Sequence, residues 1–184
     1  MKHIKLIFAL VISSMLIYSC NDNNNDDLQD QNPTNLDSGR SAIGFTTDSN
    51  FAGSTSFNLS NTTSTFAYSS SDSLARIVEV RATDVVNNLS REVIVILVMP
   101  ATTNTNSGNV NFSLDTATTS STYGNVSLRS YRDTISGPTY QSVSGNVTLT
   151  RLTNTDVMGT FSGRFQDTAM NVINVTNGSF SGRF

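Results

Sequence analysis

The chain has 184 residues, enough for one folded domain with a leader and a linker. Eleven Lys and Arg residues stand against fourteen Asp and Glu residues, so the formal net charge is −3 and no basic excess exists to neutralise nucleic-acid phosphates. We therefore expect no nucleic-acid partner, and the single cysteine and single histidine exclude an internal disulfide and a zinc site of the usual ligands.

The first 19 residues consist of a basic start and an apolar run. Lys2, His3 and Lys5 precede the stretch "LIFALVISSMLI" at 6–17. This run is too short to span a bilayer comfortably but suits the apolar part of a signal peptide. A buried core helix is the alternative, and it fits poorly with the acidic, Asn-rich stretch that follows. We expect residues 1–19 to be removed on export, which leaves nine arginines, fourteen acids, no lysine and no histidine.

Cys20 ends the stretch "IYSC" and is the only cysteine. An exported chain with one cysteine cannot form an internal disulfide, and no further Cys or His follows to complete a metal site. "IYSC" resembles the lipobox of bacterial lipoproteins, because Ile17 and the small Ser19 match it, whereas Tyr18 is bulkier than the usual residue. The resemblance implies cleavage before Cys20 and acylation of Cys20 by several chains, hence a permanent membrane anchor. A signal peptide with an incidental cysteine is the alternative.

Residues 20–40 carry the lipidated cysteine and a polar segment with almost no apolar content. Such a composition predicts a disordered, acidic tether. A calcium loop is disfavoured because the fixed ligand spacing and the turn glycine are missing. The acidic cluster of Asp22, Asp26, Asp27 and Asp30 resembles the signal that sends Bacteroidota-type lipoproteins to the cell surface. The resemblance implies a lipid-anchored protein of the outer membrane, exposed at the cell surface, with the periplasmic face as the alternative.

Residues 41–184 are rich in Ser, Thr, Asn and Gly, and short segments of alternating polarity recur between turn residues. In 74–84, one face is apolar and the other carries Glu79 and Arg81; the apolar face consists of Leu74, Val78, Val80 and Ala82. Residues 93–99 are apolar on both faces, which predicts a central strand covered on both sides and ended by Pro100. Asn87-Asn88 between these segments predicts a hairpin turn.

Three later strands each follow a Gly-Asn pair, at Gly108, Gly124 and Gly145. Their inward residues are expected to be Val110, Phe112 and Leu114, then Val126 and Leu128, then Val147 and Leu149. The motif "FSGRF" occurs at 161–165 and again at 180–184. We interpret the two copies as core strands whose glycines, Gly163 and Gly182, leave room for aromatic rings. The alternative makes Arg164 and Arg183 an anion-binding pair.

We predict an all-β domain at 41–184, a single antiparallel β-sandwich of about eight or nine strands. A half-open or closed calycin-like β-barrel is the alternative. The order of motifs from "ARIVEVRATD" through "SGNVTLTRL" to "NGSFSGRF" resembles small Bacteroidota-type surface lipoproteins of unknown function, over residues 74–184. The resemblance implies a β-sandwich or half-open barrel behind a lipidated tether, and it brings no activity and no catalytic residues.

The candidates for catalysis are few after residue 19. Without His, Lys or a usable Cys, the Ser–His–Asp and Cys–His arrangements are closed off. A carboxylate pair of the glycosidase kind remains, and its members would be Glu79 and Glu92, both expected at ordinary surface positions. We therefore predict no enzyme and no cofactor, but a structural or binding role at the cell surface. A barrel that carries an apolar ligand is the alternative, and a glycoside hydrolase is the least favoured.

Two sets of residues are candidate binding or modification sites. Tyr123, Tyr131 and Tyr140 lie in or beside one Gly/Ser-rich region, where exposed rings could stack on a glycan or contact a partner protein; edge and core packing is the alternative. Asp followed by Ser or Thr and an apolar residue resembles the O-glycosylation pattern of Bacteroidota secreted proteins. Its acceptors would be Ser73, Thr116, Thr134 and Thr168.

Overall fold

The computed structural model describes residues 40–59, 66–71, 75–103, 105, 108–114, 122–132 and 135–184, with the backbone alone at 66–71. The described residues form ten strands. These are β1 (Ser41–Phe51), β2 (Ser54–Asn58), β3 (Phe66–Ser71), β4 (Ala75–Val86), β5 (Leu89–Pro100), β6 (Val110–Ser113), β7 (Tyr123–Arg132), β8 (Ile135–Leu152), β9 (Asp156–Gln166) and β10 (Val172–Arg183).

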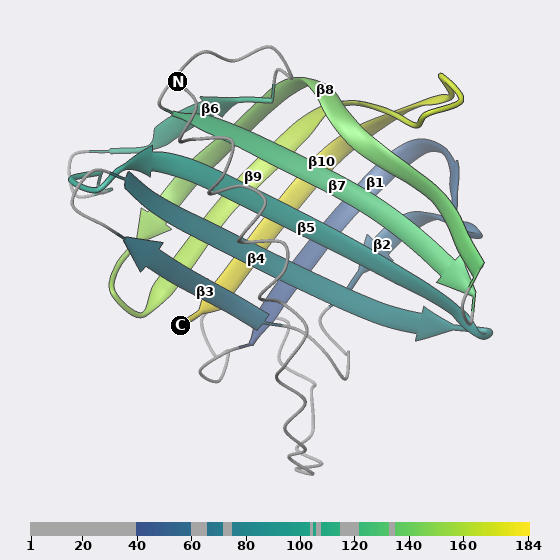
Figure 1. The fold of residues 1–184 in the computed structure, drawn as a ribbon, viewed down its shortest axis with the longest axis horizontal. Coiled ribbons are helices and arrows are strands. Elements are labelled where there is room, and N and C mark those ends of the chain that lie inside the picture. The colour runs from purple at the N-terminus through teal and green to yellow at the C-terminus, as the bar shows by residue number, and fades with distance from the viewer. Residues whose placement is uncertain are drawn as a thin grey trace, which may run out of the picture.

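All the strands belong to one antiparallel sheet with the order β2-β1-β10-β9-β8-β7-β5-β4-β3, and β6 pairs with β8. The sheet curls until β1 and β10 cross over β3 and β4, and the hydroxyl of Ser41 donates to the carbonyl of Arg81 across the interior (Figure 1). The predicted all-β antiparallel class is confirmed, and the curled sheet has the form of a half-open barrel. Ten strands replace the expected eight or nine.

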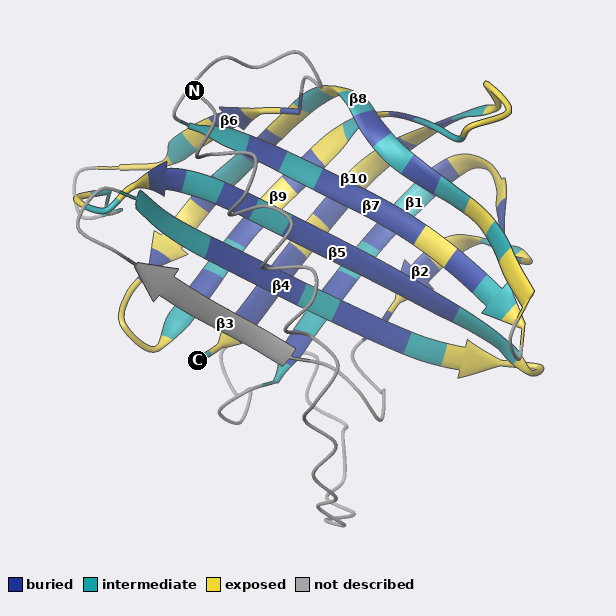
Figure 2. Cartoon of the chain, viewed as in Figure 1, coloured by how far each residue is buried: buried dark blue, intermediate teal, exposed yellow. Residues whose placement is uncertain are grey.

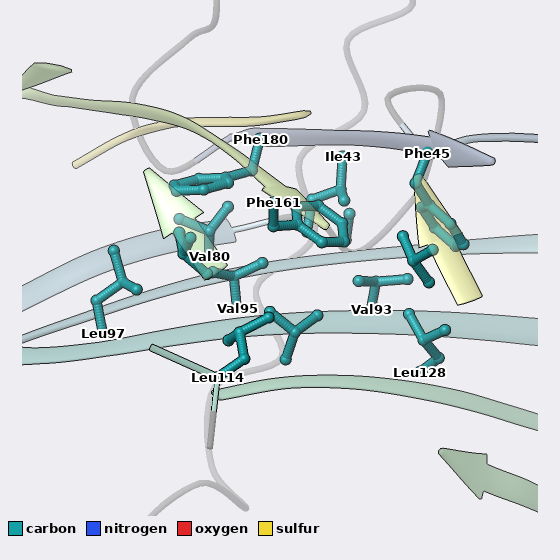
Figure 3. Packing of buried hydrophobic residues seen from close by; sticks show 14 of the residues in the cluster. Ile43, Phe45, Val80, Val93, Val95, Leu97, Leu114, Leu128, Phe161 and Phe180 are labelled. Carbon is teal, nitrogen blue, oxygen red and sulfur yellow. The ribbon is translucent and has the colours of Figure 1, made fainter. Parts of the chain in front are cut away.

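The alternating segments place their apolar side chains inside the curl. Side chains from β1, β9 and β10 point toward those from β4, β5 and β7 and fill the space between the two walls (Figure 3). The predicted inward residues Val78, Val80 and Ala82 are completely buried. The later strands follow the prediction as well, with buried side chains at Phe112, Leu114, Val126, Leu128, Val147 and Leu149.

β5 is a central strand between β4 and β7, as its composition predicted. Its inward residues at 93, 95, 97 and 99 are completely buried, and Figure 2 shows β5 and the middle of β4 as mainly buried. On the other face Ile94 is buried, while Ile96 and Val98 are half-buried. The strand ends at Pro100, where the missing N–H is tolerated.

The β4–β5 turn has the predicted Asn pair at its centre. Asn87 and Asn88 have φ angles of 52° and 60°. Two consecutive left-handed residues define the turn type whose twist matches a two-residue β-hairpin, and asparagine tolerates that conformation better than most residues. The hairpin at Asn87-Asn88 is confirmed.

The two "FSGRF" copies lie on β9 and β10, which are antiparallel partners. Gly159 pairs with Phe180 and Gly178 with Phe161, and a Cβ on either glycine would collide with the ring of its partner. The prediction that Gly163 is the covered glycine is wrong, because Gly163 faces the backbone of Ser144 instead. The glycines covered by aromatic rings, Gly159 and Gly178, each lie four residues before the motif glycines Gly163 and Gly182.

Antiparallel pairing gives the curled sheet two ends. The turns between β1 and β2, β4 and β5, and β9 and β10 lie at one end, together with the junction of β7 and β8; we call this the β4–β5 end (right in Figure 1). The other end, which we call the β8–β9 end, contains the starts of β1 and β4, the end of β10 and the β8–β9 turn.

Candidate functional site

Glu79 and Glu92, the two glutamates, do not lie at ordinary surface positions, and that expectation is wrong. Only 2% of Glu79 and 9% of Glu92 is exposed. Both side chains do lie on the outer face of the sheet, on the adjacent strands β4 and β5, as alternation requires. Their burial follows from a position in the middle of the sheet, where neighbouring strands flank each carboxylate on both sides.

An ionic network joins the two glutamates across β4, β5 and β7. The guanidinium of Arg81 lies 3.0 Å from Glu79 Oε1 and 3.6 Å from Glu92 Oε1. Arg129 on β7 pairs with Glu92 directly across the strands, with Nη1 3.4 Å from Oε2. Two carboxylates and two guanidinium groups thus alternate, so the charges balance within the network. Burial of an unpaired carboxylate would be costly, and this arrangement avoids it.

The inner face carries a second ion pair at the β4–β5 end. Arg91 Nε donates to Asp84 Oδ1 at 2.7 Å, and Nη2 donates to Oδ2, a bidentate contact. The same guanidinium lies 5.1 Å from the ring centre of Phe57 on β2, a cation–π geometry. Phe57 stacks on Phe45 with ring centres 4.5 Å apart. Arg91 therefore links the edge strand β2 to the opposite wall, and no local motif marks this role in the sequence.

The three candidate tyrosines do not form a common platform. Tyr140 is 9% exposed, and its ring meets Phe51 edge-on with centres 5.9 Å apart. Burial raises the pKa of its phenol above the ordinary value. Tyr123 and Tyr131 are half-buried and lie at opposite ends of β7, with burial also raising the pKa of Tyr123. Tyr140 thus packs in the core.

Arg164 and Arg183 do not form an anion-binding pair, and that alternative is wrong. Arg164 on β9 is paired with Asn174, whereas Arg183 on β10 is paired with Asp156 at the far end of the same ladder. Eight positions of β9 separate Arg164 from Asp156, which corresponds to roughly 26 Å of extended strand.

Most of the predicted modification sites fall outside the described residues. These are Cys20, Ser73, Thr116 and Thr134. Thr168 is described and exposed in the β9–β10 turn. The preceding Asp167 shapes this turn, because its carboxylate accepts from the backbone N–H groups of Ala169 and Asn171 and from the Asn171 amide.

A cluster of arginines at the β8–β9 end was not found from the sequence. Arg76 Nη2 donates to the carbonyl of Thr153 in the β8–β9 turn at 2.9 Å. Arg151 Nη2 lies 3.1 Å and Arg183 Nε 3.9 Å from the carboxylate of Asp156. These residues come from three distant parts of the chain, so no local motif could reveal them.

Comparisons with family models, with curated proteins and with solved structures found no match for this chain. Among the described residues, no helix is long and apolar enough to cross a membrane. The same residues hold no group of three or more His, Cys, Asp and Glu side chains suited to a metal ion.

Proposed function

We propose that this chain is an extracytoplasmic lipoprotein, anchored in the outer membrane through acylated Cys20, and that its β domain has a structural or binding role at the cell surface. The observation that carries the proposal is "IYSC": a single cysteine directly after a small residue and an apolar run, with no partner for disulfide or metal chemistry. Display on the periplasmic face is the alternative location.

The arrangement of the glutamates supports a role other than catalysis. A glycosidase needs one carboxylic acid and one carboxylate placed on either side of a bound sugar. Here Arg81 lies between Glu79 and Glu92, and Arg129 pairs with the second carboxylate oxygen of Glu92, Oε2. Both carboxylates are thus engaged in ion pairs, Glu79 within β4 and Glu92 with arginines of β4 and β7.

Because the three tyrosines do not lie together, they cannot form one binding surface. Tyr123 and Tyr131, each half-buried, remain candidates for contact with a glycan or a partner protein. Thr168 stays a candidate for O-glycosylation, and its exposed position in a turn leaves it accessible to a transferase. An intact mass equal to that of the unmodified polypeptide would remove the glycosylation proposal.

The anchor is tested by the Cys20→Ala variant. We expect the native chain to fractionate with membranes and to incorporate labelled fatty acid, and the variant to lose both properties because it lacks the thiol. A Ser19→Ala variant keeps a small residue before the cysteine and serves as the matched control. Labelling and membrane fractionation of Cys20→Ala at the native level would overturn the anchor.

A further inference from the structure

Four of the nine arginines lie at the β8–β9 end, and we call them the turn arginines. Arg40 precedes β1, Arg76 lies near the start of β4, Arg151 near the end of β8 and Arg183 at the end of β10. Three of them contact the β8–β9 turn at Thr153 or Asp156. The fourth is adjacent, because the N–H of Arg183 donates to the carbonyl of Arg40 at 2.9 Å.

The turn arginines give this end a positive charge. Among the described residues, the acidic side chain at this end is Asp156, since Glu79 further along β4 faces Arg81. Phe184 at the β8–β9 turn adds its main-chain carboxylate, so four arginines stand against two carboxylates. Asp72, between β3 and β4 in the sequence, is outside the described residues. Half of the Arg151 side chain and 47% of Arg183 is exposed. The β4–β5 end instead presents the exposed Asp48 and the half-buried Asp167 beside the exposed Arg132 and Arg164, so charges of both signs are present there.

The chain enters the fold at this same positive end. Arg40 lies 20 positions after Cys20 in the sequence. If residues 21–39 form the disordered tether that their composition predicts, a segment of that length has a root-mean-square reach of roughly 25 Å. With Cys20 acylated, a membrane surface is thus within reach of the turn arginines, whereas the β4–β5 end lies a whole strand length further away.

We propose that the turn arginines dock on anionic lipid headgroups and hold the β8–β9 end of the domain toward the membrane. The orientation in the cell rests on the proposed anchor at Cys20, while the affinity for headgroups does not. Each arginine near an anionic surface contributes about a fivefold increase in affinity, and the contribution is screened by salt. The β4–β5 end then faces away from the membrane and is available to partners.

The acidic residues of 21–39 are the competing occupant of the turn arginines. This segment holds Asp22, Asp26, Asp27, Asp30 and Asp37 and joins directly to Arg40. If these carboxylates covered the arginines, the membrane would be excluded. The experiment therefore includes a variant in which all five are changed to Asn.

Binding is measured by co-sedimentation of residues 20–184 carrying Cys20→Ser, with vesicles of phosphatidylcholine alone or mixed with phosphatidylglycerol, at low salt. We expect binding to the mixed vesicles only, and its loss in high salt. The double variant Arg151→Gln/Arg183→Gln is expected to bind about 25-fold more weakly. Arg151→Lys/Arg183→Lys keeps the charge and should restore binding, which separates electrostatics from folding. The matched control is Arg132→Gln/Arg164→Gln, two exposed arginines outside the cluster, with binding within about twofold of the parent.

Three outcomes would overturn the docking: no binding of the parent chain to mixed vesicles, an equal loss in the matched control, or binding that appears only after the five Asp→Asn changes. The last outcome would assign the arginines to the chain's own acidic segment. Because the tested chain is not acylated, none of these results bears on Cys20. Fatty-acid labelling that succeeds while vesicle binding fails would leave the anchor standing and remove the docking alone.

Discussion

Gly159 and Gly178 show at the scale of single residues how the central hairpin achieves its packing. Each is the cross-strand partner of a phenylalanine, and the two phenylalanines, Phe180 and Phe161, extend in opposite directions over the two glycines. The absent side chains let the aromatic rings lie flat against the sheet, a known device for covering glycine in β structure. The core thereby gains two large buried rings on adjacent strands.

Replacement of these glycines by alanine is expected to destabilise the fold by about 1–3 kcal/mol each, because the new methyl group would collide with a ring and with a backbone carbonyl. Gly44→Ala is the matched control, since its Cβ would lie 3.5 Å from its nearest neighbours, an ordinary contact. We expect that variant within about 0.5 kcal/mol of the parent. Urea unfolding measures all three, and equal effects at Gly44 and Gly159 would refute the packing argument.

Glu79 is the second residue whose surroundings determine how much its side chain contributes to the stability of the fold. Its carboxylate is buried on the outer face and depends on Arg81, 3.0 Å away. Glu79→Gln is expected to lower the free energy of unfolding by about 1–3 kcal/mol, because the paired charge is lost inside the sheet. Arg129→Gln, at a half-exposed position, should cost at most about 1 kcal/mol. Chemical denaturation measures the loss of stability in each of the two variants. Equal losses would mean that Glu79 is solvated and would contradict its burial.

At the scale of elements, the β4–β5 hairpin combines two long strands with the tightest connection available. The register runs without a shift from Ala75–Pro100 to Val86–Leu89, so twelve successive pairs depend on the conformation of Asn87 and Asn88. Both side chains are exposed, and their role therefore lies in the backbone conformation that they permit.

Asn88→Val is expected to destabilise the protein by about 1–2 kcal/mol, because a β-branched residue resists the left-handed conformation. Asn88→Gly should keep or raise the stability, since glycine adopts that conformation freely. Thermal unfolding compares the two variants. A valine variant as stable as the glycine variant would contradict the assignment of this turn.

At the scale of the whole molecule, acid sensitivity is determined by aspartates that accept hydrogen bonds. The pKa of Asp48 is lowered by the backbone and amide of Asn174, that of Asp167 by Asn171, and that of Asp156 chiefly by Thr155 and then by Arg151. A lowered pKa in the folded state means that the folded chain binds protons less readily than the unfolded one. The stability from these groups is therefore complete above the unfolded value, near pH 4, and falls as the pH drops further.

We expect the free energy of unfolding of the chain from Cys20 onward to be nearly constant between pH 5 and 8, where it has no histidine to titrate, and to decrease below about pH 4. Urea unfolding from pH 8 to pH 2 measures this dependence. Asp156→Asn should reduce the acid-induced loss and provides the control. A stability that rises on acidification below pH 4 would contradict the assignment.

Much of the fold follows from local pattern. Alternation predicts the inner faces of β4, β6, β7 and β8, the Asn pair predicts its hairpin, and the doubly apolar stretch predicts the central strand β5. The N-terminal strands β1 and β2 were not predicted individually, because few apolar residues mark them among Ser and Thr; the main ones are Ile43, Phe45, Phe51 and Phe57. The covered glycines were misassigned because a register shift between Val175 and Gly178 changes which residues are opposite each other.

By itself, the sequence determines that the domain is an antiparallel all-β structure, because period-two alternation and turn chemistry are encoded within a few residues of each other. The sequence also predicts that Cys20 is a lipid anchor, because the number of Cys and His residues can be read from it without coordinates. The tertiary structure alone decided that Glu79 and Glu92 are buried together, that Arg91 reaches Phe57 and that four arginines meet at one end. Each of these depends on strands from distant parts of the chain becoming neighbours, and the curl of the whole sheet sets that proximity.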